Sequence, residues 1–536
     1  MTKKILMAGV FALIAIAPAC TDLTEVPKSA ITPENFYRNA NEALGGLASV
    51  YANLRTTDDE YYNISEISTD EMIVPTRGQD WYDNGKWLDI HRQTFTPNSP
   101  AGLDNINSAW TNLFIGVARA NVVLHGIGLN NFEGKASMVA EARYLRAFYY
   151  YLLMDLFGGV PIVCEETGNP LCSGIDIAQR PRNTRAEVFG FVESELKAIR
   201  PDLPPSWPAA MNGRITQGAV DALLASLYLN AQVFTGTVTT AGLQPGTAHW
   251  QDALTYANAV ISSPQYRLTT DANQGCNTGG TGQTNGPGCG WFANFAATNN
   301  TSPEIIFAVK YAAVTDLGLN FMMRVLHYNQ YSGANSPWNG FSTLADTYAA
   351  FDPNDNRKHI FLAGQQVNLA TGLPATDRQG NPLIFDPNIP DVTHATEGQG
   401  IRIAKWPYDP AHVNQDAGND YAWLRLGEMY LIRAEANNEL GNSAAAIADI
   451  NTIRARVNAP PLAAGLTQQQ VRDAILQERL FELTAEGKRR TDLVRFGKFT
   501  SGTWYAKTSN APYKILFPIP QTQIETNPKL EQNPGY

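Results

Sequence analysis

The chain has 536 residues, of which 44% are hydrophobic, 10% aromatic and 17% charged, so it can fold around a large core and is not a disordered protein. Its formal net charge of −10 argues against proteins that bind nucleic acid through clustered Lys and Arg. The length leaves room for several domains or for one large helical body built from repeated helix pairs.

The first 19 residues have the features of an export signal. Two lysines precede the uncharged apolar stretch from Ile5 to Ala17, which at 13 residues is too short to span a bilayer. Small residues lead up to Cys20, so we expect cleavage before Cys20 and its acylation, as in bacterial lipoproteins. Residues 20–33 would then be a lipidated tether. The alternative is an ordinary secretory signal followed by an incidental cysteine.

The other four cysteines form two local pairs, Cys164 with Cys172 and Cys276 with Cys289. In an oxidising compartment, two short-range disulfides are the simplest interpretation. Neither pair has the close spacing of zinc ligands, and the seven histidines are scattered. We therefore expect no structural metal and no cofactor.

Helical periodicity is clearest in residues 135–157, where Met138, Ala142, Leu145 and Tyr149 recur at steps of three and four before a Gly-Gly pair. Capping boxes at Thr184–Glu187 and Thr467–Gln470 predict the starts of two further helices, one running through Leu196 and one towards Glu486. Additional helices are expected at 34–54, 107–127, 216–235, 248–262, 421–440 and 443–457.

Residues 223–261 and 431–454 have the pattern of tetratricopeptide-type helix pairs, with small residues at the contacts and a glycine at the turn of the second. A plain helical hairpin is the alternative for each segment. Such pairs bury their apolar faces only against neighbours, so several must stack. Residues 271–300 and 364–420 are rich in Gly, Asn, Pro, Asp and Thr, which predicts irregular insertions or short strands.

Several separated strings occur in a defined order along nearly the whole mature chain. The most characteristic runs from Ala140 to Tyr150 and continues as Phe157-Gly158-Gly159-Val160-Pro161. The others are 43–51, 110–124, 213–216, 478–493, 518–520 and 527–536. In content and order these strings resemble the SusD/RagB family of outer-membrane nutrient-uptake lipoproteins.

The resemblance implies a mainly α fold, a superhelix of tetratricopeptide-like pairs with a loop-rich, partly irregular region that binds ligand. We expect one body over 34–536, with a helical part at 34–270, a loop-rich insertion at 271–420 and a closing helical part at 421–536. The resemblance also implies a surface-exposed lipoprotein of the outer membrane, without catalytic activity, that serves a SusC-like TonB-dependent transporter.

Charged residues within these strings are interpreted as scaffold and not as an active site. Glu482, Glu486 and Arg489 stand at helical spacing, where they can form ion pairs within and between helices. The same holds for Arg143, Arg146 and Arg490. The Asp352–Arg357 segment lacks the Gly and Glu of a calcium loop, so a turn is expected.

A sugar site needs aromatic surfaces for the C–H faces of the ring and amide, carboxylate or guanidinium groups for the hydroxyls. The loop at 77–87 is the densest combination of these residue types. Its candidate ligand contacts are Arg77, Trp81, Tyr82, Asn84 and Trp87. Further candidates lie in the irregular segments: Trp291 beside Phe292, Trp338 beside Asn339, and Trp406 near Tyr408. For each of these the alternative is a core aromatic.

We therefore expect a protein that captures an oligosaccharide or other glycan and hands it to a SusC-like transporter, with no nucleic-acid partner. A peptide-binding member of the same family is one alternative. A surface glycoside hydrolase is another, for which Asp70, Glu71, Asp80 and Asp83 supply carboxylates near aromatics. Serine-hydrolase, zinc-protease and nucleotide-binding motifs do not occur in the sequence.

Overall fold

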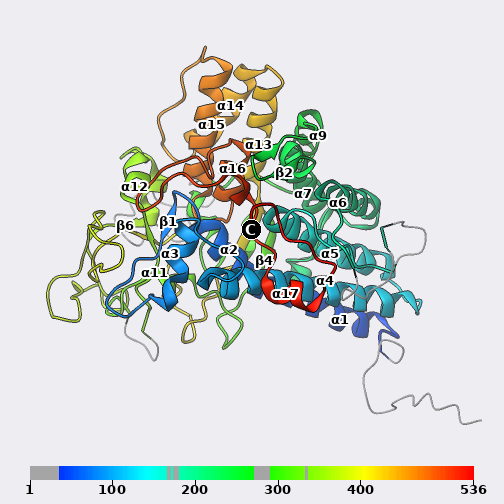
Figure 1. Cartoon of the computed structure of the whole chain (residues 1–536), viewed down its shortest axis with the longest axis horizontal. Helices are drawn as coiled ribbons and strands as arrows, with labels where there is room; N and C mark the ends of the chain where they lie inside the picture. The colour runs from blue at the N-terminus through cyan, green and yellow to red at the C-terminus, as the bar shows by residue number, and fades with distance from the viewer. Residues whose placement is uncertain (1–35, 166–170, 173–179, 271–289, 332–335) are drawn as a thin grey trace, which may run out of the picture.

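The computed structural model describes residues 36–165, 171–172, 180–270, 290–331 and 336–536. Helices of the two ends of the chain gather on one side of the molecule and at its top, and the loop-rich segments gather on the other side (Figure 1). The predicted signal peptide, Cys20 with its tether, and the Cys276/Cys289 pair lie outside the described residues.

The N-terminal part is a layered array of helices. Neighbouring helices in the chain pack on one another, α4 on α5 and α5 on α6, while α7 packs on α9. From Ala140 onwards nearly every residue of α5 is buried, so α5 runs through the centre of this array. The helices are α1 (Ala40–Ala52), α2 (Leu54–Ile67), α3 (Lys86–His91), α4 (Asn107–Gly128), α5 (Lys135–Phe157), α6 (Arg185–Ile199), α7 (Gln217–Leu229), α8 (Ala231–Phe234) and α9 (Trp250–Ile261).

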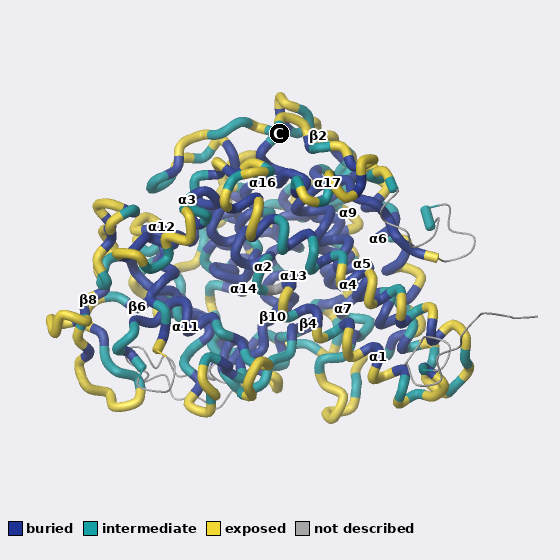
Figure 2. The backbone as a smooth tube through the Cα atoms, turned by 60° about the horizontal axis from the view of Figure 1, so that its bottom comes forward, coloured by how far each residue is buried: buried dark blue, intermediate teal, exposed yellow. Residues whose placement is uncertain are grey.

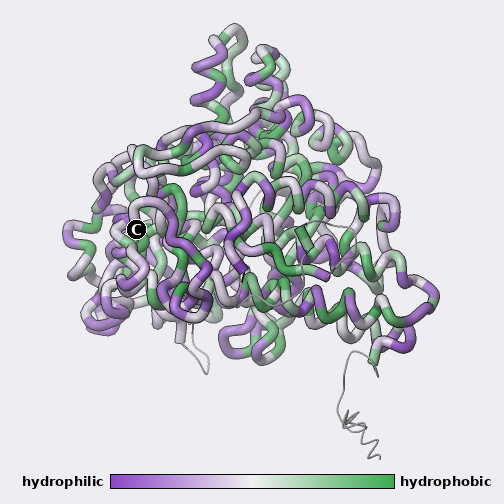
Figure 3. Tube along the Cα trace, turned by 45° about the vertical axis from the view of Figure 1, so that its right-hand side comes forward, coloured by the Kyte–Doolittle hydropathy of each residue, from purple (hydrophilic) through white to green (hydrophobic). Residues whose placement is uncertain are grey.

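The C-terminal helices continue the array. Helix α13 (Leu426–Glu439) packs on α9 as well as on α14 (Ser443–Ala455) and α15 (Gln468–Leu483). The α14 and α15 ends project from the body and enclose a small core of their own, around Ile450 and Ile475 (Figure 3). Helices α16 (Arg489–Arg495) and α17 (Gln521–Thr526) follow.

The loop-rich part contains two short helices, α11 (Phe321–Val325) and α12 (Ala345–Ala350). The described strands pair as two-stranded antiparallel sheets: β1 (Met72–Ile73) with β5 (Ser342–Thr343), β2 (Thr237–Thr239) with β3 (Gly242–Gln244), β4 (Ile305–Val309) with β10 (Tyr421–Arg425), β6 (Phe361–Leu362) with β9 (Arg402–Ile403), and β7 (Gly364–Gln365) with β8 (Ile384–Phe385). One short π-helix is η2 (Gly102–Ile106). The short 3-10 helices are η1 (Asp83–Gly85), η3 (Arg200–Asp202), η4 (Ala209–Met211), η5 (Gly290–Asn294), η6 (Asn299–Thr301), η7 (Asn356–Ile360) and η8 (Pro512–Ile515).

The mainly helical fold is confirmed, and the helix at 135–157 has the predicted bounds. Both predicted capping boxes form, at the starts of α6 and α15. The predicted helix at 216–235 is interrupted at Asn230. The prediction for 421–440 is wrong at its start, because residues 421–425 pair with β4, more than 100 positions earlier in the chain. Helix α2 was not predicted separately from α1.

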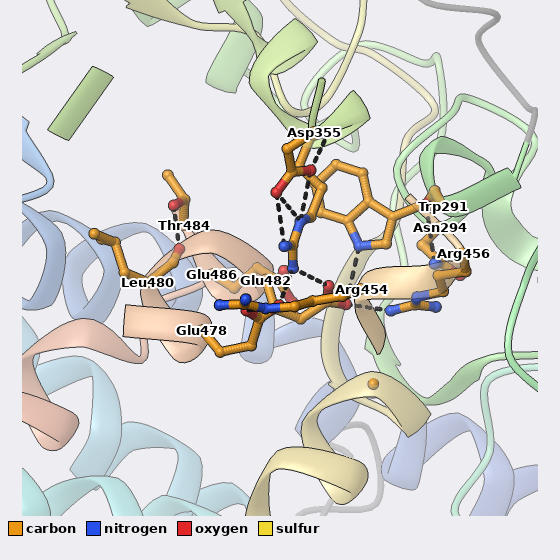
Figure 4. Close-up of polar contacts among 12 residues, drawn as sticks. Trp291, Asn294, Asp355, Arg454, Arg456, Glu478, Leu480, Glu482, Thr484 and Glu486 are labelled. Carbon is orange, nitrogen blue, oxygen red and sulfur yellow. Dashed lines mark hydrogen bonds and ion pairs between the residues drawn. The ribbon is translucent and has the colours of Figure 1, made fainter. Parts of the chain in front are cut away.

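The centre of the molecule is buried and its loops are exposed (Figure 2). Within this centre, Glu482 is the meeting point of several cations (Figure 4). Its Oε1 accepts hydrogen bonds from Arg425 Nη1 at 2.6 Å, from Arg456 and from Trp291, and its Oε2 accepts one from Arg357 at 2.9 Å. Burial alone would raise the pKa of Glu482. The neighbouring guanidinium groups have the larger combined effect and hold this pKa well below its usual range.

These ion pairs confirm the scaffold interpretation of the charged strings, although the partners are more distant than predicted. Glu486 pairs with Arg425 and with the buried Lys405. Arg489 forms a bidentate pair with Asp70, each N–O distance being 2.7 Å. The charges therefore join the C-terminal helices to the segment that follows α2 and to the loop-rich part.

The last segment of the chain closes the far end of α5. The main-chain N–H of Phe517 donates to Leu156 O at 2.9 Å, and the Asn533 side chain donates to Phe157 O at 3.0 Å and to Phe517 O at 2.7 Å. Cys164 and Cys172 form a disulfide. Over the described ranges, no helix is both long enough and apolar enough to cross a membrane.

Candidate ligand-binding surface

The loop at 77–87 is held in an unusual backbone conformation. Arg77 and Asp80 exchange two main-chain hydrogen bonds of 3.0 Å, which closes a tight turn. Trp81, Asp83 and Asn84 then have φ angles of +63°, +40° and +56°. For L residues this left-handed region costs roughly 1–2 kcal/mol each, so the surrounding contacts must impose it. Backbone strain of this kind is typical of ligand sites.

Trp81 is fixed against a segment far away in the chain. Its indole Nε1 donates to Trp338 O at 2.6 Å, and its ring lies 5.4 Å from that of Phe341. At Gly340 a Cβ atom would lie only 2.3 Å from the Trp81 ring, so this glycine permits the close approach. Trp81 and Trp338 are both half-buried, so part of each side chain is accessible. Two candidates from separate segments therefore share one patch of surface.

The other residues of the loop divide into exposed and supporting side chains. Tyr82 is 58% exposed, and Asn84 is also exposed. Trp87 is only 6% exposed, its Nε1 donates to Asp83 Oδ2 at 2.6 Å, and its ring lies 5.6 Å from Trp81. Tyr82 and Asn84 can reach a ligand, whereas Trp87 supports Trp81 from beneath.

Arg77 is buried and works as a brace. Its guanidinium donates to Gly340 O at 2.9 Å, to Gln399 O at 2.7 Å and to the Ser342 hydroxyl at 3.0 Å. Buried Arg402 shares the last two of these acceptors. Burial lowers the pKa of Arg77 to about 10. The two arginines hold the segment that carries Trp338, and Arg77 has no access to a ligand.

Two residues that the sequence did not single out complete this patch. The Tyr328 hydroxyl donates to Asp80 Oδ2 at 2.6 Å, and the half-exposed Arg378 guanidinium lies 4.3 Å from the centre of the Tyr328 ring. Arg378 also pairs with Asp80 and with Glu397, and Glu397 contacts buried His327 at 2.9 Å. Burial lowers the pKa of His327. Because Tyr328 stands about 250 positions from Asp80, no spacing signal could have linked them.

A second aromatic group lies beyond the next turn. Gln330 N donates to His327 O, and this turn places Tyr328 and Tyr331 on neighbouring stretches of chain. The Tyr331 ring lies 4.5 Å from that of His412 and 5.8 Å from that of Tyr408, and all three residues are half-buried. Tyr331, Tyr408 and His412 are called the outer aromatic group below.

Trp291 and Trp406 are not on this surface. Trp291 is 2% exposed and donates to Glu482, and Trp406 is 4% exposed and stacks on Tyr421 with ring centres 5.2 Å apart. Both are core aromatics, the alternative weighed from the sequence. The irregular sequence around both residues predicted that they would be exposed. Instead, both indoles donate hydrogen bonds to buried acceptors, and their rings pack against Phe295 and Phe321 in the core.

The four carboxylates considered for hydrolysis are engaged elsewhere. Asp70 pairs with Arg489, and Glu71 is buried and accepts from Ala485 N at 2.9 Å. Asp80 binds Tyr328 and Arg378, and Asp83 binds Trp87. In the part of the chain that the structure describes, no three His, Cys, Asp or Glu residues come together as a metal site would require.

Comparison with known proteins agrees with this architecture. A model of the SusD family matches residues 303–536, and a model described as starch-binding associating with outer membrane matches residues 41–229. The chain is 27% identical over 523 residues to the starch-binding protein SusD of Bacteroides thetaiotaomicron, covering 89% of this chain and 85% of that one.

Solved structures agree as well. A SusD-like protein from Bacteroides fragilis aligns with a TM-score of 0.72 at 20% identity, covering 94% of this chain and 98% of that one. Surface glycan-binding protein A from Bacteroides thetaiotaomicron, in complex with laminarihexaose, aligns with a TM-score of 0.67 at 21% identity, covering 92% and 99%. At these identities the likeness concerns the fold. The two family models together match well over half of the chain, which therefore belongs to the SusD/RagB family.

Proposed function

We propose that the protein is a non-catalytic glycan-binding lipoprotein, and that it binds an oligosaccharide on the surface formed by Trp81, Tyr82, Asn84, Trp338, Tyr328 and Arg378. The observation that carries the proposal is the half-buried pair of Trp81 and Trp338, joined by a hydrogen bond between two distant segments. This pair offers indole surface at a place where the backbone is strained and heavily braced.

The side chains around the tryptophans suit the two kinds of surface on a sugar. The rings of Trp81, Trp338 and Tyr82 can cover C–H faces, and Asn84 and Arg378 can pair with hydroxyl groups. Most of these side chains are already held by contacts within the protein, so little conformational entropy would be lost on binding.

The relatives support the same class of ligand. One is named for starch binding, and one solved structure contains laminarihexaose. We further infer that acylated Cys20 anchors the protein on the outside of the outer membrane, and that a SusC-like TonB-dependent transporter receives the glycan. The description of the second family model, which includes association with the outer membrane, supports this location.

The alternatives fit the geometry less well. A peptide-binding member of the family would favour an apolar cleft that pairs with main-chain groups, whereas this surface is a braced patch of aromatic and charged side chains. A glycoside hydrolase needs two carboxyl groups free to act as acid and base or nucleophile. All four carboxylates near the aromatics are instead bound to protein groups.

The proposal can be tested on purified protein lacking residues 1–20. Starch and laminarin oligosaccharides and a set of peptides would be titrated by calorimetry, and reducing ends would be assayed in parallel. We expect saturable binding of a glycan and no release of reducing sugar. Turnover at an enzymatic rate, or binding of peptides alone, would contradict the proposal. Separately, purification from outer membranes should recover a TonB-dependent barrel with the tagged full-length chain.

A further inference from the structure

A second concave site lies away from this surface, between the N-terminal helices and strand β4. It is a pocket of about 230 Å³ formed by the loop before α7, the residues after α9, and β4 with the turn before it. Its lining includes Trp207, Asn212, Gln265, Tyr266 and Asn300, and none of the residues of the proposed glycan surface. A ligand here would be bound independently of Trp81 and Trp338.

The aromatic wall of this pocket is rigidly held. Trp207 Nε1 donates to Ile215 O at 2.8 Å, and the Arg214 guanidinium lies 3.9 Å from the centre of the indole ring. Arg214 is in turn fixed by a bidentate contact with the fully buried Glu141, whose Nε–Oε2 distance is 3.0 Å. The indole therefore keeps its orientation whether or not a ligand is present.

The pocket has no uncompensated charge. The Arg214 cation is neutralised by Glu141, and Lys310 is neutralised by Asp420. These are the charged side chains of the lining, together with Glu141 behind it. An anionic or cationic ligand would find no free counter-charge, so the site favours an uncharged ligand.

Several exposed polar side chains on the described part of the lining are free of protein partners. Within the residues that the structure describes, the side chains of Ser206, Gln265 and Asn300 make no hydrogen bond to protein. At the floor, the hydroxyls of Thr216 and Tyr266 lie 3.0 Å apart and bond to each other. One indole, two free amides and a free hydroxyl around a small neutral pocket form the same combination that a sugar ring requires.

We propose that this pocket is a second binding site, which takes a single neutral sugar ring or a polyol of that size. The volume of about 230 Å³ is suited to one ring. The choice of a sugar as ligand rests on the proposed function, but the site itself does not. A neutral ring held here would be one end of a branched glycan or a separate monosaccharide.

The experiment titrates glucose, galactose and N-acetylglucosamine into the protein lacking residues 1–20, with sodium glucuronate as the charged analogue. We expect one of the neutral sugars to bind saturably with one equivalent per chain, and crystals soaked in it to show the sugar beside Trp207. The double variant Gln265→Ala, Asn300→Ala should weaken this binding about tenfold. The matched double variant Asn41→Ala, Gln251→Ala, which removes two exposed amides elsewhere, should leave it unchanged.

The Tyr82→Ala variant distinguishes binding at this pocket from binding at the proposed glycan surface. It should weaken oligosaccharide binding and leave monosaccharide binding unchanged. Absence of saturable binding by all three neutral sugars would overturn the second site, as would equal affinity in the Gln265→Ala, Asn300→Ala variant. Tighter binding of glucuronate than of glucose would overturn the assignment to a neutral ligand. None of these three results would bear on oligosaccharide binding at Trp81.

Discussion

The indole Nε1 of Trp81 donates a 2.6 Å hydrogen bond to the main-chain oxygen of Trp338, which lies 257 positions later in the chain. The bond joins the loop after β1 to the segment before β5, and these two strands pair with each other. The candidate glycan surface therefore exists only when both segments are folded together, and its two tryptophans form a single unit.

Tyr82 is the most direct test of this surface, because its exposed ring makes little contact with the rest of the protein. Tyr82→Ala should leave the thermal midpoint unchanged and weaken glycan binding by about 1 kcal/mol, roughly fivefold, through loss of aromatic contact with the sugar. Isothermal titration and a thermal melt of the same sample measure both quantities. Leu440→Ala, a similarly exposed apolar residue on the helical side, is the control, and a Tyr82→Ala protein with full affinity would exclude Tyr82 from the site.

The outer aromatic group predicts a dependence on ligand length. If a glycan chain runs from Trp81 past Tyr328, only longer oligomers reach Tyr331 and Tyr408. Tyr331→Ala and Tyr408→Ala should therefore weaken binding of long oligosaccharides several-fold and leave short ones unaffected. A titration series of increasing oligomer length measures this. Equal losses for all lengths would mean that the two tyrosines act by stabilising the surface.

Glu482 is expected to be critical for stability because three buried guanidinium groups converge on it. Glu482→Gln would leave these cations without their shared counter-charge and should cost about 3–5 kcal/mol in the free energy of unfolding. Urea denaturation followed by circular dichroism measures the change. Glu42→Gln, which breaks an exposed pair with Arg38, is the control and should have no measurable effect.

Glu66 and Glu71 predict a pH dependence of stability. Burial is the largest cause that raises the pKa of Glu66 to about 7 and the pKa of Glu71 above its usual range, and the two carboxyl groups share a hydrogen bond. A raised carboxyl pKa stabilises the fold at low pH, and this contribution is lost as pH rises through about 7. Between pH 5 and 8 the wild type should lose on the order of 3 kcal/mol relative to Glu66→Gln.

Denaturation of both proteins at a series of pH values measures this difference. The amide of Glu66→Gln still offers an oxygen to Gly487 N, which bonds to Glu66 in the wild type. Glu133→Gln, at an exposed position before α5, controls for the change of one net charge. If the curves of wild type and Glu66→Gln stay parallel, the pair does not hold a proton at neutral pH.

The helices were largely predictable because their signals are local. The period of apolar residues in α5 and the capping boxes of α6 and α15 lie within the elements that they define. Strand β10 was not predictable in this way, since its partner β4 lies in another part of the chain and the segment 421–425 runs directly into a helix. Helix α2 was missed because polar and charged residues outnumber apolar ones in its sequence, although its second half is buried.

The candidate site was predictable only in part, because exposure of a side chain depends on contacts with distant segments. Aromatic density marked the loop at 77–87, but composition does not distinguish an exposed ring such as Tyr82 from a supporting one such as Trp87. Trp291 and Trp338 stand in similar irregular sequence, yet one packs in the core and the other at the surface. What separates them is the set of acceptors that the fold brings near each indole.

The last segment of the chain covers the C-terminal end of α5, and this arrangement limits when that part of the structure can form during protein synthesis. Phe157 ends a helix in the first third of the chain, and its main-chain oxygen accepts a hydrogen bond from the side chain of Asn533, 376 positions later, as well as one from the nearer Arg182. Contacts of such separation form slowly and late in folding. The contacts that cover this end of α5 can therefore form only after almost the whole polypeptide has been synthesised.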